Sequence, residues 1–151
     1  MPEFLDLYGK ANKAIRALAE AAMQRHGLHF GQNHLLAVLW HQDGCTPGEI
    51  AAALKVSAPT VVKMASRMAA AGLLTRRRDR EDNRLVRLWL TDAGRALEKP
   101  IEAERRSLER KITAGLTEAE RKHLLSALAK ILESSTALLK ETDRPKESDI
   151  G

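Results

Sequence analysis

The sequence predicts a mainly α-helical protein with one small β-hairpin, and three observations support this fold class. Aromatic residues make up only 3% of the 151 residues, so leucine, alanine, isoleucine and valine must fill most of the core. Apolar residues recur at helical spacing along most of the chain. One stretch, residues 74–90, instead has the short alternating pattern of paired strands. We therefore expect six helices, with the hairpin placed after the fourth.

The first two helices are predicted from apolar spacing and from the residues that end them. Over Phe4–Met23, apolar residues alternate four and three positions apart, which places a heptad-like stripe on one helix face. Gly27 suits the end of this helix. A second helix is expected over Gly31–Gln42, with a leucine-rich core face, and the dipeptide Asp43–Gly44 ends it.

Two capping motifs predict a close pair of helices in the middle of the chain. Residues 46–49, Thr-Pro-Gly-Glu, form a capping box for a third helix that ends near Leu54. Ser57 caps a fourth helix that runs to about Ala71. Because only a tight turn at Lys55–Val56 separates the two helices, their layout is that of a helix-turn-helix.

The hairpin and the last two helices follow in order. Strands are expected at Leu74–Arg78 and Arg84–Leu90, around a polar tip. Thr91 then caps a fifth helix over Asp92–Ala114, which Pro100 is expected to kink. A further capping box at Thr117 opens the sixth helix, whose apolar residues form two rows: Leu124, Leu128, Ile131, Ser135 and Leu138, then Leu125, Leu132 and Leu139. Such rows require a partner surface.

The fourth helix has one face suited to a core and another suited to a polar partner. At 100° per residue, a first set shares the core face: Val61, Met64, Ala65 and Met68. Thr60, Lys63 and Arg67 lie together about 120° round the helix. A DNA major groove admits such a helix, although a solvated face with two cations explains this face equally well.

The charged segment after this helix favours DNA. Five arginines fall between Arg76 and Arg84 in a chain of net charge +5, and a basic hairpin directly after a helix-turn-helix is a wing. The planar, weakly hydrated guanidinium group suits a minor groove. Asp82 lies two residues before Arg84, so its carboxylate can hold that arginine in one extended conformation.

The stretch from Leu28 to Leu97 resembles the winged helix of the MarR family of bacterial transcriptional regulators. The matching segments are "LHFGQNHLLAVL", "GCTPGEIAAAL", "SAPTVVKMASRMAAAGLLTR" and "DNRLVRLWLTDAG". The flanking helices also fit, so the resemblance covers nearly the whole chain. It implies a homodimer, interlocked through the first and last two helices, that places two recognition helices on a pseudo-palindromic operator.

The resemblance also implies a set of DNA-binding residues. On the recognition helix they are Ser57, Thr60, Val61, Lys63 and Arg67. On the wing we expect Arg76, Arg77, Arg78, Arg80, Asp82, Asn83 and Arg84, with Arg84 at the tip and Asp82 orienting it. Many family members bind small aromatic or phenolic effectors in a cleft, and here Asn33 and Trp40 are the candidate lining residues; pairing of Asn33 within the protein and core packing of Trp40 are the simpler alternatives.

The expected organisation has four parts. Residues 1–30 form the N-terminal helix of a dimerisation lobe, 31–91 the winged helix-turn-helix lobe, 92–141 the C-terminal dimerisation helices, and 142–151 a flexible tail. We expect a repressor that binds double-stranded DNA as a homodimer and that a small molecule releases. The alternatives are a winged helix that docks proteins, and a redox- or zinc-responsive member of the same family.

Other functions find little support in the sequence. No catalytic constellation, Gly-rich phosphate loop or cofactor motif is present, so we expect no enzyme, no cofactor and no metal. The five histidines are not accompanied by the cysteines or acids that complete a zinc shell, and Cys45 is the only cysteine. The longest apolar run is too short to span a bilayer. We expect a cytoplasmic protein without a membrane partner.

Overall fold

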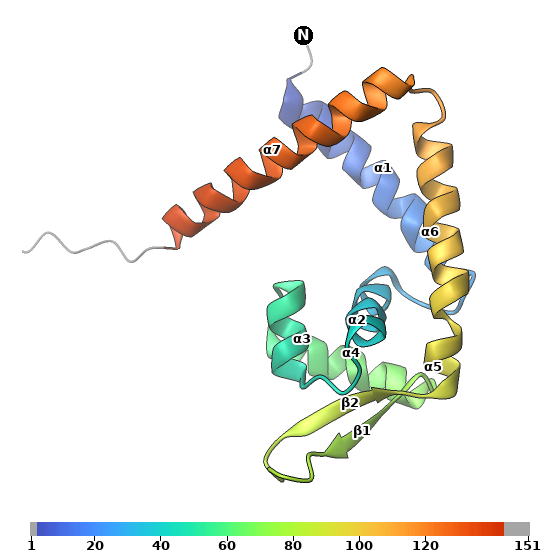
Figure 1. The fold of residues 1–151 in the computed structure, drawn as a ribbon, viewed down its shortest axis with the longest axis vertical. Helices are drawn as coiled ribbons and strands as arrows, with labels where there is room; N and C mark the ends of the chain where they lie inside the picture. Colours follow the sequence, from blue (N-terminus) through green and yellow to red (C-terminus); the bar gives the residue numbers. More distant parts are fainter. Residues whose placement is uncertain (1–2, 144–151) are drawn as a thin grey trace, which may run out of the picture. The chain divides into compact units, whose positions relative to one another are not determined.

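The computed structural model describes residues 3–143 and confirms a mainly helical chain with a two-stranded antiparallel hairpin (Figure 1). Its elements are α1 (Phe4–Gln24), α2 (Phe30–His41), α3 (Pro47–Leu54), α4 (Ala58–Ala70), β1 (Leu74–Arg78), β2 (Val86–Leu90), α5 (Asp92–Ala96), α6 (Glu98–Thr113) and α7 (Glu118–Thr142). Two compact units divide between Glu109 and Arg110, within α6. From residue 144 on, the expected tail lies outside the described residues.

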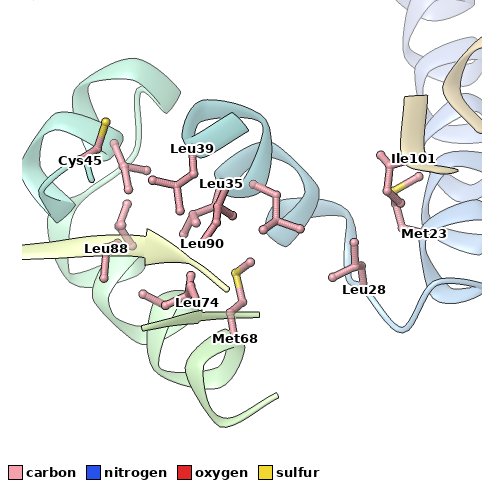
Figure 2. Packing of buried hydrophobic residues seen from close by; sticks show 14 of the residues in the cluster. Met23, Leu28, Leu35, Leu39, Cys45, Met68, Leu74, Leu88, Leu90 and Ile101 are labelled. Atoms are coloured by element: carbon pink, nitrogen blue, oxygen red, sulfur yellow. The ribbon is translucent and has the colours of Figure 1, made fainter. Parts of the chain in front are cut away.

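The core of the first unit lies where α2, α3 and α4 pack against the hairpin (Figure 2). Its largest fully buried side chains are Leu28, Leu35, Leu36, Leu39, Ile50, Met68, Leu74, Leu88 and Val61. Met23 of α1 and Ile101 of α6 are buried in the same cluster. The hairpin is thereby fixed to the body of the unit through the apolar face of its strands.

Local hydrogen bonds explain the close pairing of α3 and α4. The Thr46 hydroxyl accepts from the Glu49 N–H at 3.2 Å, and the Glu49 carboxylate accepts from the Thr46 N–H, which completes the predicted capping box. Lys55 ends α3 in the left-handed region, at φ 55°. Ser57 then caps α4 by accepting from the Thr60 N–H at 3.3 Å, so the turn between the two helices is short and fully bonded.

The second strand is shorter than the sequence predicts. It begins at Val86 rather than Arg84, because the residues before it belong to a hydrogen-bonded turn. The Arg84 N–H donates to the Asp82 carboxylate at 3.1 Å, and the Leu85 N–H donates to the Asp82 carbonyl at 3.0 Å. A backbone engaged in this way cannot pair with β1. The prediction of a strand over Arg84–Leu90 was therefore wrong at its start.

The predicted fifth helix, Asp92–Ala114, is divided into α5 and α6 at Leu97. Pro100 is the physical reason, because proline lacks an N–H and its ring collides with the carbonyl four residues earlier, that of Ala96. Helical bonding resumes with the Ile101 N–H, which donates to the Leu97 carbonyl at 3.0 Å. The sequence located the disturbance correctly but predicted a kink where the helix breaks.

Two helices carry apolar side chains that the protomer leaves exposed. On α1 these include Phe4, Leu5, Leu7, Tyr8, Ile15 and Leu18, all at least 40% exposed. On α7 no residue is buried, and its exposed leucines and isoleucine are Leu124, Leu125, Leu128, Ile131, Leu132, Leu138 and Leu139. Among the helices of residues 3–143, none has the length and apolar character that crossing a bilayer requires.

Candidate nucleic-acid interface

The second helix of the pair, α4, presents a polar face to solvent. Thr60, Lys63 and Arg67 are all exposed, as their common helical face requires. The Ser57 and Thr60 hydroxyls lie 2.7 Å apart at the helix start, where the positive end of the helix dipole favours an anion. Val61 is different, because its side chain is completely buried. Its assignment to the DNA-contacting set needs correction: it belongs to the core.

The strand pleat separates the arginines of β1. Arg76 and Arg78 pair with Leu88 and Val86 of β2, on the face that carries the core leucines. Arg76 donates to the Ser66 hydroxyl of α4 at 2.7 Å, which joins the hairpin to that helix. Arg77 lies on the opposite face, where its guanidinium group covers the ring of Trp89 at 5.4 Å. The three arginines therefore do not form one row.

The tip of the hairpin holds the expected pair. The Arg84 Nε donates to the Asp82 carboxylate at 3.1 Å, and the arginine side chain remains 91% exposed. Arg78 donates to the Asn83 carbonyl at 3.1 Å, from the foot of the turn. Arg80 is exposed beside it. The wing thus combines a fixed backbone with a freely accessible guanidinium group at its end.

A second ion pair, between Asp79 and Arg87, lies next to the turn at this tip. It was not predicted from the sequence. Asp79 accepts from the Arg87 Nε, and from the backbone N–H groups of Glu81 and Asp82 at 2.7 and 3.2 Å. The Arg87 hydrogen bond is the largest cause that lowers the pKa of Asp79 from 3.8 to about 2. One feature does favour an acidic partner for Arg87. It lies directly opposite Arg77 on the paired strands, and like charges in that arrangement destabilise a sheet.

The candidate effector residues border one groove. Asn33 and Trp40 of α2 lie along a groove of about 650 Å³, together with side chains of α6 that include Ile101, Glu102 and Arg105. The Trp40 indole N–H donates to the Gly94 carbonyl at 3.0 Å, which fixes the ring at the groove wall. The two residues are thus brought together, with apolar and charged groups around them.

Cys45 and two of the histidines have structural partners. The Cys45 thiol is buried and donates to the Gln42 carbonyl at 3.1 Å. Burial raises the pKa of this thiol, which disfavours the thiolate that redox sensing uses. His26 contacts Glu104 and His29 contacts Glu20, at 3.4 and 3.2 Å. Within residues 3–143, no three histidine, cysteine or acidic side chains are grouped to hold a metal.

Comparisons with known proteins agree with this architecture. The model of the MarR family matches residues 30–86. The HTH-type transcriptional regulator TtmR of Methylorubrum extorquens is 30% identical over 91% of this chain; the match covers 66% of TtmR, just under two thirds of its length. The S. aureus MepR–DNA complex superimposes with a TM-score of 0.79 at 25% identity, over 89% of this chain and 99% of MepR. BpsR of Bordetella bronchiseptica superimposes with a TM-score of 0.74 at 26% identity, over 85% and 93%.

Proposed function

The chain belongs to the MarR family of winged helix transcriptional regulators, and from this premise we propose that it binds operator DNA and represses transcription. The single observation that carries the proposal is the exposed polar face of Thr60, Lys63 and Arg67 on a capped helix-turn-helix. The MepR structure, which was determined with DNA, supports it. Membership of a family of regulators also agrees with the expectation that the chain is not an enzyme.

Each part of the surface has a role that its chemistry supports. The face of α4 enters a major groove, where Thr60, Lys63 and Arg67 contact base edges and phosphates. The Ser57 end of α4 meets a phosphate, which the positive end of the helix dipole and the hydroxyls of Ser57 and Thr60 favour. Arg84 enters the adjacent minor groove, where its planar cation suits the negative potential. Arg76 and Arg78 contact the phosphates of the DNA backbone beside this minor groove. Such a protein acts in the bacterial cytoplasm, where its operators are.

The protomer works as a homodimer in this proposal. The apolar faces of α1 and α7 are exposed in the chain alone, and covering them with a second copy removes them from water. The residues of 1–30 and 92–141 then form the dimerisation lobe, while 31–91 form the DNA-binding lobe. A two-fold axis places the two recognition helices about one helical turn of DNA apart, on the halves of a pseudo-palindrome.

Salt dependence tests the DNA-binding proposal. We expect the affinity for duplex selected from a random-sequence pool to fall steeply with salt, with a log–log slope of about −0.9 per phosphate contact. Titrations by fluorescence anisotropy at several salt concentrations measure that slope. Replacing both Lys63 and Arg67 by glutamine should flatten it. Weak binding with a flat salt response would contradict the proposal and favour a protein-docking role for the winged helix.

A small aromatic or phenolic effector is proposed for the groove at Asn33 and Trp40. The groove has the volume for such a molecule, with a Trp ring for stacking, an amide for a hydroxyl group and the Arg105 cation for a carboxylate. BpsR, which has a similar structure, was described with regulation of its DNA binding by 6-hydroxynicotinic acid. Binding in the groove releases DNA only if the effector has higher affinity for an arrangement of the two copies that binds DNA weakly.

An Asn33→Leu variant tests the effector site. The effector is first found by screening hydroxylated aromatic acids, 6-hydroxynicotinic acid among them, for release of bound duplex. Loss of the amide should weaken release about 10-fold, since it leaves a polar group of the effector unpaired, while DNA affinity without effector stays unchanged. Asn12→Leu on α1, which does not line the groove, is the matched control, and its mass in solution is also measured because α1 belongs to the proposed dimerisation lobe. Equal release from both variants would place the effector elsewhere.

A further inference from the structure

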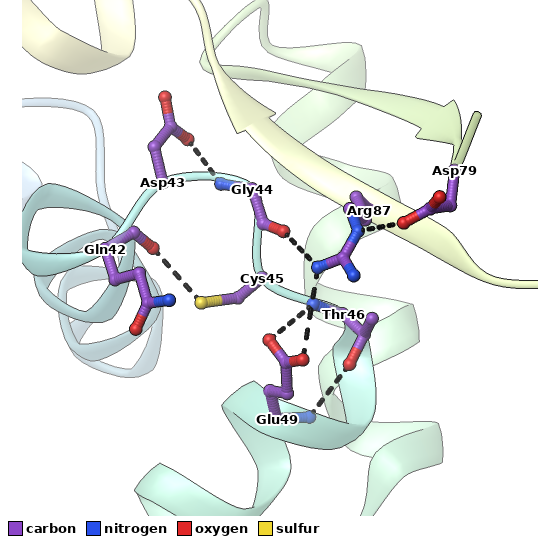
Figure 3. Close-up of polar contacts among 8 residues, drawn as sticks. All are labelled: Gln42, Asp43, Gly44, Cys45, Thr46, Glu49, Asp79 and Arg87. Carbon is purple, nitrogen blue, oxygen red and sulfur yellow. Dashed lines mark hydrogen bonds and ion pairs between the residues drawn. The ribbon is translucent and has the colours of Figure 1, made fainter. Parts of the chain in front are cut away.

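Arg87 joins the wing to the body of the winged helix, and the DNA-binding surface described above does not include it. From β2 its Nε donates to Asp79, and its Nη1 donates to the Gly44 carbonyl at 2.9 Å (Figure 3). Glu49 of α3 lies 3.9 Å from the same nitrogen. One half-buried guanidinium group therefore bridges the wing turn and the loop between α2 and α3.

The loop end of this bridge is rigid. Gly44 has φ +74°, and a Cβ at this position would lie 2.5 Å from the Trp89 ring, so the backbone packs directly on that ring. Arg77, on the same face of the hairpin as Arg87 and Trp89, adds support by covering the Trp89 ring. The Gly44 carbonyl is thus a fixed acceptor, and its hydrogen bond holds the Arg87 guanidinium group in one position.

The wing end of the bridge leads to the tip arginine. Asp79 holds the turn by accepting from the backbone N–H groups of Glu81 and Asp82. The Asp82 carboxylate in turn holds both the backbone and the side chain of Arg84. A continuous series of hydrogen bonds therefore runs from Gly44 through Arg87, Asp79 and Asp82 to the exposed guanidinium group. With a pKa of about 2, Asp79 is an anion throughout the neutral range.

We propose that Arg87 is a positioning residue for DNA binding, which fixes the wing turn through Asp79 so that Arg84 is presented to the minor groove. The inference rests on the proposed function. Its physical basis is preorganisation, because a turn that is ordered before binding does not lose that conformational freedom on the DNA. Arg87 does not itself reach the tip, so its effect must pass through Arg84.

A double-mutant cycle tests the proposal on the full-length protein and a duplex selected from a random-sequence pool. In the unaltered background, Arg84→Ala should weaken affinity about 10-fold, the size expected of a good groove contact. In an Arg87→Gln background the same change should cost less than about 3-fold, since contacts in one network are not additive. Exchange of the Glu81 and Asp82 amide protons should also be faster in Arg87→Gln.

Two matched variants separate positioning from charge and from stability. Arg87→Lys keeps the charge but loses the planar fork, so it should reduce the Arg84 penalty as Arg87→Gln does. Arg95→Gln removes a cation that binds the same loop, through Asp43 at 3.2 Å, without touching the wing, and should leave the Arg84 penalty intact. Arg87→Lys and Arg95→Gln should both keep near-normal thermal stability.

The outcomes distinguish this inference from the proposed function. Additive penalties for Arg84 and Arg87, with normal duplex binding by the unaltered protein, would overturn the positioning role alone. A full Arg84 penalty in Arg87→Lys would show that charge rather than geometry matters, and would also overturn it. Absence of duplex binding by the unaltered protein would overturn both proposals together.

Discussion

A Leu132→Asp variant is expected to dissociate the proposed dimer and to lower affinity for the proposed operator about 10²- to 10⁴-fold, the factor by which linked binding sites exceed single ones. Leu132 is 69% exposed in the protomer and lies on the apolar side of α7. In a dimer that covers this helix, each copy would lose about 1.5–3 kcal/mol of leucine burial. Each copy would also bring an unpaired carboxylate into an apolar contact, which costs more.

The measurements are the mass in solution, by sedimentation, and duplex binding by fluorescence anisotropy. Because Leu132 is exposed in the chain alone, the helical content should be unchanged; its measurement by circular dichroism separates loss of binding from unfolding. Ser126→Asp is the matched control, since it adds the same charge to an exposed position on the opposite side of α7. A Leu132→Asp protein that stays dimeric, or a monomer with full operator affinity, would show that α7 does not hold the copies together.

The helix pair was predictable from sequence because its determinants are local. The capping box at Thr46, the cap at Ser57 and the apolar spacing of α4 act within a few residues. The predicted bounds of these helices are accordingly confirmed to within a residue. Periodicity was also the better guide at Val61: it placed the residue in the core, whereas the family resemblance placed it on the DNA, and the side chain is fully buried.

The wing was predictable in outline but not in its inner contacts. That Arg77 faces away from Arg76 and Arg78 follows from the two-residue period of a strand. The Arg87 bridge was beyond local reasoning, because its partner Gly44 is 43 residues away. Only the packing of the hairpin on the loop between α2 and α3 brings these groups together. Long-range polar contacts of this kind leave no periodic pattern in a sequence.

A Gly94→Ala variant is expected to lose about 3 kcal/mol of folding stability, in the upper range for overpacking. Gly94 lies in α5, and a Cβ there would come far closer than 3.0 Å to the Leu73 carbonyl. That obstacle is backbone, so no side-chain rotation relieves it. The same carbonyl accepts from the Thr91 N–H at 3.1 Å, and Gly94 itself accepts from Trp40. Moving either segment therefore breaks bonds that join α5 to the wing and to α2.

Thermal unfolding at one fixed protein concentration measures the effect, since the stability of the proposed dimer would depend on concentration. A loss of this size lowers the Tm by about 6–12 °C in a chain of this length. Gly48→Ala is the matched control: a Cβ there meets nothing closer than the Thr46 hydroxyl at 3.9 Å, and alanine in a helix should add up to about 1 kcal/mol. The two substitutions are chemically identical and have opposite expected signs. If Gly94→Ala were as stable as the unaltered protein, the close approach of α5 to Leu73 would have to be wrong, and with it the path by which the hairpin connects to α5 and α6.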